Sequence, residues 1–496
     1  MSGTEEDPGA ASSVRHGLPE LIAERREKAR RLKEADDQAF PYHFRGTEPI
    51  AEILSQYEHL SAGDETEDKH RVAGRLLARR EGGGAAFLDL LDRTGKIQLH
   101  ARMDVLGEQR FAELTSLDIG DLIGVDGAAL RSRRGQISLR VDSFALLAKA
   151  LRPPPDTRGG LADVETRHRR RELDLIANEE ARELFVLRAQ VIAAVRRFLD
   201  AEGFVEVETP VLQPLYGGAL ARPFTTHHNA LNRTLFLRIA TELYLKRLIV
   251  GGLEKVYELG KDFRNEGVDT THNPEFTMLE WYEAFADYQD IADRCERLVA
   301  YVAQEVGYQG PIDFTPPWRR QTLAGAIRER TGIDILATRE RDALAAEMRA
   351  RGLAVPDDDT WPQLVDELLS KHVEPTLEQP TFLLDYPVEL SPFAKRHRSE
   401  EGLAERFEAF AAGMEIANAF TELNDPDEQR RRFEEQRKLA AAGDEETQPY
   451  DEAFIEALEY GMPPTGGIGI GIDRLVMVLS GRDSIREVVL FPAMRD

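Results

Sequence analysis

Two neighbouring stretches, VYELGKDFRNE at residues 256–266 and THNPEFTMLEWY at residues 271–282, decide the fold of the C-terminal part of the chain. Each contains a strand-like run, and the polar loop between them includes Gly267 and Pro274, so the pair predicts an antiparallel hairpin. Successive side chains of a strand point to opposite faces of a sheet. The residues that this alternation places on one face are Phe276, Met278, Glu280 and Tyr282. That face would carry an aromatic ring, a carboxylate and a phenol, although a half-buried strand with incidental polar residues would show the same pattern.

A second pair of strand-like runs lies within residues 406–425, around a turn of small residues. Asn418, Phe420 and Glu422 alternate onto one face, whereas Glu415 is out of phase and reaches that face only through a β-bulge or an edge position. Carboxylates beside an anionic phosphate would repel it, so we expect them to hold a divalent cation that bridges phosphate oxygens. Surface carboxylates on an acidic protein are the alternative interpretation.

The stretch GGIGIGIDRL at residues 466–475 predicts a glycine-rich strand that enters an apolar helix. Glycines at alternate positions leave one face of a strand bare, which lets a planar ligand or another backbone approach closely. Arg474 then stands at the start of the helix. A dinucleotide-binding fold is disfavoured, because the G-x-G-x-x-G spacing is not met and no acidic residue follows at the required distance.

The region between residues 72 and 146 has a different sequence pattern, in which short strand-like runs are separated by turns. Five strands, with a helix at residues 111–117 between the third and the fourth, predict a small Greek-key barrel of the oligonucleotide-binding kind. The five runs occupy residues 72–78, 85–91, 96–101, 122–127 and 137–146.

Taken together, these segments resemble the motifs of class II aminoacyl-tRNA synthetases. The matching stretches are FRNE at residues 263–266 and HNPEFT at 272–277 for motif 2, GIGIDR at 469–474 for motif 3, and GFVEVETP at 203–210 for motif 1, the dimer-interface element. The likeness is greatest to the lysyl-tRNA synthetases of subclass b. It is carried by RPF at residues 222–224, THHN at 226–229, ELYLKR at 242–247 and TELNDP at 421–426. The resemblance extends from about Val72 to Met494.

The resemblance implies an α+β protein, with an N-terminal OB-fold β-barrel and a class II catalytic domain made of an antiparallel β-sheet flanked by helices. It implies that ATP activates L-lysine to lysyl-adenylate, and that the lysyl group then moves to the 3′-hydroxyl of tRNA(Lys). The implied cofactor is Mg²⁺, with up to three ions, and the implied assembly is a homodimer. Composition and pattern predict a disordered tail at residues 1–16, a helical extension at 17–64, a linker at 151–180 after three consecutive prolines, and a helical insertion at about 322–372. Between these parts lie the anticodon-binding barrel at residues 65–150 and the catalytic domain at 181–496 that the resemblance implies.

For the nucleotide, the resemblance implies that Arg264 binds both the α-phosphate and the amino-acid carboxylate, and that Phe276 and Arg474 lie on the two faces of the adenine. Arg264 and Arg474 are the implied catalytic residues, since a permanently charged guanidinium suits the charge that develops on phosphorus. Glu408 and Glu415 are the implied Mg²⁺ ligands. The implied ATP contacts are Arg264, Glu266, His272, Phe276, Glu408 and Arg474.

For lysine, the resemblance implies that Glu242 and Glu280 hold the α-amino group and Asn418 the carboxylate. Glu422 and Tyr282 would receive the ε-ammonium. A buried carboxylate without its ammonium costs several kcal/mol, so neutral and acidic amino acids should be rejected. The implied lysine contacts are Gly218, Glu242, Glu280, Tyr282, Asn418, Phe420 and Glu422, of which Phe420 packs the methylenes.

In the barrel, the resemblance implies anticodon contacts for Arg75, Phe87 and Gln98, with Phe87 as a stacking platform. Phe87 could equally be a core aromatic. One residue departs from the family pattern, because Gln136 stands where lysyl members commonly carry Glu. That departure bears on the detail of anticodon reading and leaves the role of the domain unchanged.

Three other functions are weighed against this one. An aspartyl or asparaginyl synthetase of the same subclass is disfavoured by Glu422, since an aspartate pocket needs a cation there. A lysine ligase acting on a protein such as elongation factor P is disfavoured because those relatives lack the barrel. A non-catalytic paralogue that binds nucleic acid is disfavoured by Arg264, Glu408, Glu415 and Arg474, which a retired site would be free to lose.

The composition sets outer limits on the function. The 496 residues carry a formal net charge of -25, which argues against a protein that coats nucleic acid indiscriminately. RNA contacts must then be local, and the basic stretches at residues 25–33 and 167–171 are candidates as well as ordinary solvated helix faces. Cys295 is the only cysteine, which excludes an internal disulfide. No apolar run approaches the ~18 residues of a membrane span and the start MSGTEEDP is not a secretory signal, so we expect a cytoplasmic protein without membrane partners.

Overall fold

The computed structural model describes residues 17–34, 40–155, 160–356, 360–441 and 448–495. The tail predicted at residues 1–16 lies outside the described residues. The chain divides into two compact units, residues 1–182 and 183–496.

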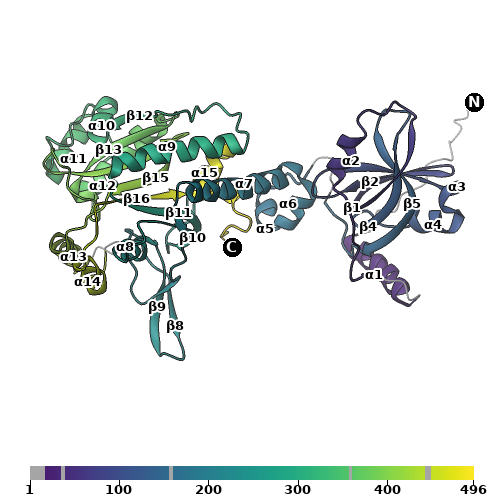
Figure 1. Cartoon of the computed structure of the whole chain (residues 1–496), viewed down its shortest axis with the longest axis horizontal. Helices are drawn as coiled ribbons and strands as arrows, with labels where there is room; N and C mark the ends of the chain where they lie inside the picture. Colours follow the sequence, from purple (N-terminus) through teal and green to yellow (C-terminus); the bar gives the residue numbers. More distant parts are fainter. Residues whose placement is uncertain (1–16, 35–39, 156–159, 357–359, 442–447, 496) are drawn as a thin grey trace, which may run out of the picture. The chain divides into compact units, whose positions relative to one another are not determined.

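The first unit contains a closed barrel with the strand order β1-β2-β3-β5-β4 (Figure 1). Its strands are β1 (Glu65–Gly82), β2 (Ala85–Leu91), β3 (Lys96–Arg102), β4 (Leu122–Arg131) and β5 (Ile137–Ala148). The pair β3 and β5 is parallel and the other pairs are antiparallel. The predicted five-stranded barrel is therefore confirmed. β1 begins well before the predicted residue 72, because the polar residues at its start pair with β4 and carry no apolar pattern.

Six helices complete the described part of this unit, and two of them stand where one helix was predicted at residues 111–117. Its place is taken by α3 (Met103–Leu106) and α4 (Glu108–Thr115), which meet at Gly107, where φ is 76°. The other helices are α1 (Leu18–Glu34), α2 (Ile50–Gln56), α5 (Val164–Arg169) and α6 (Arg171–Ala177). α2 joins the barrel core through Ile50 and Ile53.

The second unit is built on an eight-stranded sheet with the order β12-β13-β14-β15-β16-β11-β10-β6 (Figure 1). Its strands are β6 (Val205–Glu206), β10 (Lys255–Phe263), β11 (Glu275–Ala284), β12 (Arg319–Thr322), β13 (Thr381–Pro387), β14 (Leu403–Ala411), β15 (Met414–Thr421) and β16 (Thr465–Gly471). The antiparallel sheet expected from the sequence is confirmed at its centre. At the two edges the expectation is wrong, because β6 pairs parallel to β10 and β12 pairs parallel to β13.

One face of this sheet packs against helices. The helices are α7 (Glu179–Ala201), α9 (Tyr288–Glu305), α15 (Ile472–Ser480) and α16 (Ile485–Val488), and all four contribute to the largest apolar core. Leu279 and Trp281 of β11 belong to this core. Strand alternation therefore turns Met278, Glu280 and Tyr282 to the opposite face, where the functional pocket lies.

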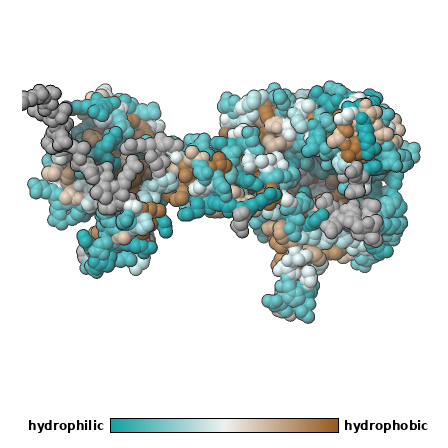
Figure 2. Space-filling model, turned by 180° about the vertical axis from the view of Figure 1, so that it is seen from behind, coloured by the Kyte–Doolittle hydropathy of each residue, from teal (hydrophilic) through white to brown (hydrophobic). Residues whose placement is uncertain are grey.

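Smaller elements surround the sheet. A three-stranded sheet of order β7-β9-β8 is made of β7 (Leu212–Gln213), β8 (Thr225–His228) and β9 (Arg233–Leu237). The remaining helices are α8 (Glu242–Val250), α10 (Leu323–Thr331), α11 (Arg341–Ala350), α12 (Trp361–Leu368), α13 (Pro426–Ala441) and α14 (Glu452–Glu459). α10, α11 and α12 fall within the predicted insertion and share a core of their own. Polar residues cover most of the surface seen in Figure 2, and none of the described helices is long and apolar enough to cross a membrane.

Candidate active site

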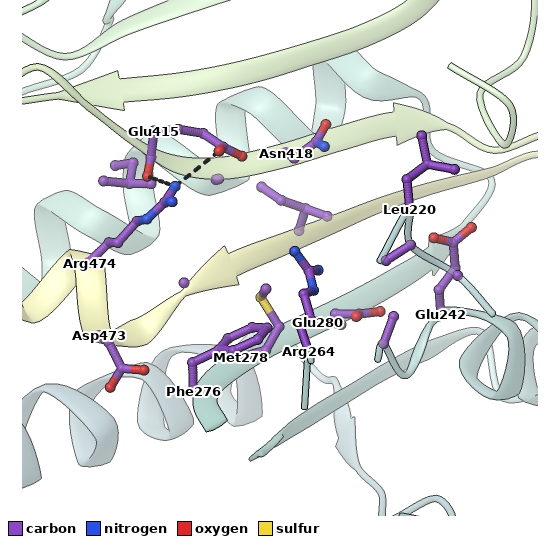
Figure 3. Close-up of a pocket in the computed structure, with 18 of the residues that line it drawn as sticks. Leu220, Glu242, Arg264, Phe276, Met278, Glu280, Glu415, Asn418, Asp473 and Arg474 are labelled. Atoms are coloured by element: carbon purple, nitrogen blue, oxygen red, sulfur yellow. Dashed lines mark hydrogen bonds and ion pairs between the residues drawn. The ribbon is translucent and has the colours of Figure 1, made fainter. Parts of the chain in front are cut away.

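A cavity of about 380 Å³ opens on the face of the sheet that the helices leave free (Figure 3). Strands β11, β15 and β16 form its floor, and the loop after β10 and the segment around Gly218 form its rim. Of the residues predicted at the site, those that line the cavity are Gly218, Glu242, Arg264, Glu266, His272, Phe276, Glu280, Tyr282, Glu415, Asn418, Phe420 and Arg474. Two predicted site residues, Glu408 and Glu422, are buried and do not line it.

The glycine strand β16 lies between the two strands that carry functional side chains. Gly469 pairs with Glu280 on one side and with Asn418 on the other, and Gly467, Gly469 and Gly471 all line the cavity. The bare strand face predicted from the alternating glycines is confirmed. Because nothing projects from β16 at these positions, a ligand can lie flat between the neighbouring strands.

A β-bulge brings Glu415 to the same surface as Asn418 and Phe420. The β14–β15 register pairs Ala409 with Ala417 but Phe410 with Glu415, so one extra residue is inserted at Ile416. Glu415 lines the cavity. The sequence predicted a β-bulge because Glu415 does not fit the alternation of Asn418 and Phe420, and this bulge is confirmed.

Two arginines and an aromatic ring occupy one part of the pocket. Arg474 donates from Nη1 to the backbone oxygen and to Oε2 of Glu415, both at 3.0 Å, as the dashed lines in Figure 3 show. Its Nη2 lies 3.2 Å from Nε2 of His272. The guanidinium of Arg264 stands 5.0 Å from the centre of the Phe276 ring, and its Nε has no hydrogen-bond partner among the described residues. The pocket thus presents cationic donors beside an aromatic face.

Next to Arg474, the buried carboxylate of Asp473 connects helix α15 to strand β11 and helix α7. Asp473 accepts a hydrogen bond of 2.7 Å from the backbone N of Thr277 and forms an ion pair of 2.6 Å with Arg188. Arg188 belongs to α7. Arg188 was not among the predicted site residues, because its contact with Asp473 joins residues far apart in the chain.

A second set of buried ion pairs lies near Arg264 and is centred on Arg238. Arg238 forms ion pairs with Glu258 and, at 3.2 Å, with Asp262. Burial raises the pKa of Asp262 to about 6, against the opposing charges of Arg238 and Arg264. The carboxylate therefore keeps its charge at neutral pH only with the help of these guanidinium groups.

The other part of the pocket is lined by carboxylates (Figure 3). Glu280 accepts hydrogen bonds from the backbone N of Thr241 at 3.1 Å and from the hydroxyl of Tyr282 at 3.2 Å. Burial, together with the nearby charges of Asp262 and Glu242, raises the pKa of Glu280 to about 8. A cationic ligand would relieve this accumulation of negative charge.

Gly218 forms the rim beside Glu242. Its φ is 91°, and a Cβ there would lie 2.9 Å from Cβ of Glu242. Its backbone N donates to Oε1 of Gln448 at 3.1 Å, and Nε2 of Gln448 donates to the backbone oxygen of Ala219. Only glycine fits this position without strain, because the backbone is left-handed and the neighbouring side chain is in contact.

Glu422 is buried beside the pocket, on the side of β16 toward which a Cβ at Gly467 would point. Its side chain is 0% exposed and its Oε2 is 2.5 Å from Nζ of Lys246, while Oε1 has no hydrogen-bond donor among the described residues. A Cβ on Gly467, which lines the pocket, would collide with Oε1. Lys246 was not among the predicted site residues. Its position four residues after Glu242 in a helix was the available signal, since side chains at that spacing are neighbours.

Glu408 and Glu415, the predicted metal ligands, differ in their surroundings. Glu408 accepts hydrogen bonds from the hydroxyl of Tyr386 at 2.8 Å and from Arg406 at 2.5 Å, and Glu415 faces the cavity. Burial raises the pKa of Glu408 to about 7, and the charge of Glu415 contributes in the same direction. Within the described residues there is no group of three or more potential ligands. Two mutually repelling carboxylates nevertheless fit Mg²⁺, which takes one or two carboxylates and completes its shell with phosphate oxygens and water.

The residues predicted to contact the anticodon lie on the barrel of the first unit. Phe87 stacks on His100 with ring centres 4.7 Å apart and is not part of the barrel core, so the alternative of a core aromatic is excluded. Arg75 donates to the backbone oxygen of Gly120 at 2.8 Å, and Gln98 is buried and accepts from Ser138 at 3.3 Å.

Comparisons with known proteins agree with both units. The family model of class II tRNA synthetases (D, K and N) matches residues 163–495, and that of the OB-fold nucleic acid binding domain matches residues 70–147. The chain is 52% identical to the lysine–tRNA ligase of Synechococcus sp. (strain CC9311), over 96% of this chain and 99% of that relative. It is also 52% identical to the lysine–tRNA ligase of Moorella thermoacetica, over 96% and 98% of the two chains, and to that of Chloroflexus aurantiacus, over 97% and 99%.

Proposed function

The chain belongs to the class II tRNA synthetases, within the lysine–tRNA ligases, and on that premise we propose which of its residues carry the reaction. The enzyme uses ATP to activate L-lysine and transfers the lysyl group to tRNA. The observation that carries the assignment of residues is one cavity that joins the guanidinium groups of Arg264 and Arg474 to the carboxylates of Glu242 and Glu280. A nucleotide and a cationic amino acid can meet only where both kinds of charge line one space.

In the first step, the carboxylate of lysine attacks the α-phosphorus of ATP and pyrophosphate leaves. The carboxylate is already ionised, so no general base is needed, and catalysis consists of positioning and electrostatic stabilisation. Arg264 binds the α-phosphate and the lysine carboxylate, and it stabilises the charge that develops between them. Phe276 and Arg474 hold the adenine between them, and Glu266, His272 and Glu408 complete the ATP contacts.

Mg²⁺ held by Glu408 and Glu415, in up to three ions, would neutralise charge on the phosphates. Arg474 donates to Glu415 and lies beside His272, which supports a common position for the metal ligands and the adenine contacts. In the second step, the 3′-hydroxyl of the terminal adenosine of tRNA(Lys) attacks the carbonyl carbon of the adenylate, loses its proton, and displaces AMP.

Lysine selectivity rests on the carboxylates. Glu242 and Glu280 hold the α-ammonium at the rim formed by Gly218, and Asn418 contacts the carboxylate. Tyr282 and Phe420 flank the side chain, and Glu422, beside Gly467, attracts the ε-ammonium. The cations near that end are already paired, Lys246 with Glu242 and Glu422 and Arg406 with Glu408, so the side-chain carboxylate of aspartate would meet unfavourable negative charge.

The barrel is proposed to read the anticodon of tRNA(Lys) through Arg75, Phe87 and Gln98. Phe87 already stacks on His100 and is only partly buried, which supports a role as a platform for an unstacked base. The parts of the chain would then act as a helical extension at residues 17–64, an anticodon-binding domain at 65–150, a linker at 151–180 and a catalytic domain at 181–496.

A cytoplasmic homodimer is proposed as the working form. Large apolar side chains lie exposed in and near the segment that resembles motif 1, the dimer-interface element of the family. They are Val205, Val211 and Leu212, together with Leu253, which comes just before the strand β10 that pairs with β6. Burial of such residues against a second copy would remove them from water.

Pyrophosphate exchange into ATP tests the assignment. Exchange should require L-lysine and should be absent with aspartate or asparagine, the other substrates of this branch of the family. Equal exchange with aspartate would overturn the proposal, because the same carboxylates cannot favour both charges.

A further inference from the structure

Lys246 places an ammonium of the protein itself in the part of the pocket where carboxylates gather. Its Nζ lies 2.5 Å from Oε1 of Glu242 and 2.5 Å from Oε2 of Glu422. The side chains of Lys246 and Glu422 are 0% exposed and that of Glu242 is 5% exposed. A fully buried lysine is rare and needs charged partners, so this group of three is a specific arrangement of the site.

The Lys246 ammonium also faces the pocket's aromatic wall. Its Nζ lies 5.9 Å from the ring centre of Tyr282 and 5.2 Å from that of Phe393, and both rings line the cavity. A Cβ added at Gly467 would point at Oε1 of Glu422 and at the ring of Tyr282, and this Oε1 has no hydrogen-bond donor among the described residues. One oxygen of Glu422 is thus held by Lys246, and the other is available next to Gly467, a residue of the pocket lining.

The charges at this end match a particular class of ligand. Glu242, Glu280 and Glu422 carry three negative charges when ionised, and Lys246 neutralises one of them, which leaves two. An amino acid with ammonium groups at both ends of its side chain supplies two positive charges, and its carboxylate goes to Arg264 under the proposed function. Without Lys246, three carboxylates would share a buried space and at least one would take up a proton.

We propose that Lys246 is a specificity-determining residue, which holds Glu422 ionised through one oxygen and leaves the other to receive the ε-ammonium of the substrate. Lys246 touches no reacting atom, and it acts on the substrate through Glu422. This inference rests on the proposed function, since it assumes that lysine occupies the carboxylate end.

The titratable groups that face Lys246 and Glu422 come from two elements. Glu242 lies on the same helix, α8, and Glu280 and Tyr282 lie on β11. The charges of Glu242 and Glu422 keep the pKa of Lys246 raised although burial alone would lower it, and burial raises the pKa of Glu422 against the charge of Lys246. Removal of the ammonium should therefore shift the titration of Glu422 to higher pH.

The test replaces Lys246 in the full-length enzyme and measures lysine-dependent pyrophosphate exchange from pH 6.5 to 9. Lys246→Met keeps the length and removes the charge, and Lys246→Gln removes the charge but can still donate hydrogen bonds. In either variant the KM for lysine at pH 7 should rise on the order of 100-fold, as expected when a buried charge pair loses a partner. The KM should recover toward the wild-type value as pH rises, while the KM for ATP and kcat at saturating lysine stay unchanged.

Lys255→Met is the matched control. Lys255 also pairs with a carboxylate, Glu283 at 2.9 Å, and lies 5.3 Å from the ring centre of Phe204, but it does not line the cavity. This variant should keep the wild-type pH profile for lysine.

Each outcome decides a separate question. Wild-type enzyme without lysine-dependent exchange would remove the proposed function itself. Wild-type exchange with an unchanged lysine KM in the Lys246 variants would overturn the inference alone. A pH-independent loss that affects lysine and ATP equally, or a loss of folding in both variants, would assign Lys246 to stability and would also overturn it.

Discussion

The two parts of the pocket hold their charges differently. Arg264 and Arg474 stand on the lining, beside Phe276 and His272, where a nucleotide can touch them directly. Lys246 and Glu422 are fully buried beside the pocket, and Lys246 acts on the substrate only through Glu422. The arginine part can be understood from its side chains one by one, whereas the carboxylate part works only as a balanced set, because a buried charge without its partner is unstable.

The largest expected effect comes from the arginine part. Arg264→Ala should reduce the kcat of lysine-dependent exchange by on the order of 1000-fold, since a guanidinium that stabilises charge in the transition state contributes that much or more. Lysine binding, measured by calorimetry without ATP, should weaken far less. An equal loss in both would mean that Arg264 supports the fold of the pocket and has no special part in the transition state.

The carboxylate part should respond in the opposite sense. Glu422→Gln should raise the KM for lysine on the order of 100-fold and leave the KM for ATP unchanged, since the amide cannot pair with the ammonium and also leaves Lys246 with one carboxylate fewer. Exchange assays with each substrate varied in turn provide the two constants. A uniform loss would show that the two parts are not separable.

A substitution in the barrel should leave both parts of the pocket unaffected, because the barrel belongs to the other unit of the chain. Phe87→Ala should raise the KM for tRNA by roughly 10-fold, in keeping with the 1–3 kcal/mol that an aromatic ring contributes by stacking on a base. Lysine-dependent exchange needs no tRNA and should not change. Aminoacylation and exchange measured on the same preparation distinguish the two effects, and a change in exchange would contradict the assignment.

The smallest effect is a pH dependence of lysine binding. Burial raises the pKa of Glu280 to about 8, so the carboxyl group is partly protonated at pH 7 and must lose that proton to bind the α-ammonium. The KM for lysine should therefore fall as pH rises from 6.5 to 8 and level off above 8, by at most about tenfold per pH unit for one proton. The KM for ATP serves as the control. A lysine KM that rises with pH in this range would contradict the proposed role of Glu280.

Much of the fold could be predicted because its strands alternate. The faces of β11 and β15, the bare strand of β16 and the bulge at Glu415 all follow from a period of two residues. The start of β1 was missed, because its polar residues pair with β4 without an apolar pattern. The parallel edge pair of β6 and β10 was missed for a similar reason, since β6 has only two residues.

The candidate site could be predicted where it depends on motifs and not where it depends on distant contacts. Phe276, Arg264 and Arg474 sit in recognisable stretches and line the pocket. Arg188 and Asp473 form an ion pair although most of the sequence of the catalytic unit lies between them. No local sequence pattern predicts a pair of this kind. Lys246 was missed although its neighbour Glu242 was named, because its second partner, Glu422, comes close only through the tertiary fold.

A crystal structure with L-lysine and a non-hydrolysable ATP analogue tests the central claim most directly. The claim is that one lysine molecule spans both parts of the pocket. Its carboxylate should contact Arg264, and its ε-ammonium should lie against Tyr282 and Gly467, within reach of the free oxygen of Glu422. Lysine bound with its ε-ammonium on Glu280, or outside the cavity lined by Arg264, would contradict the account.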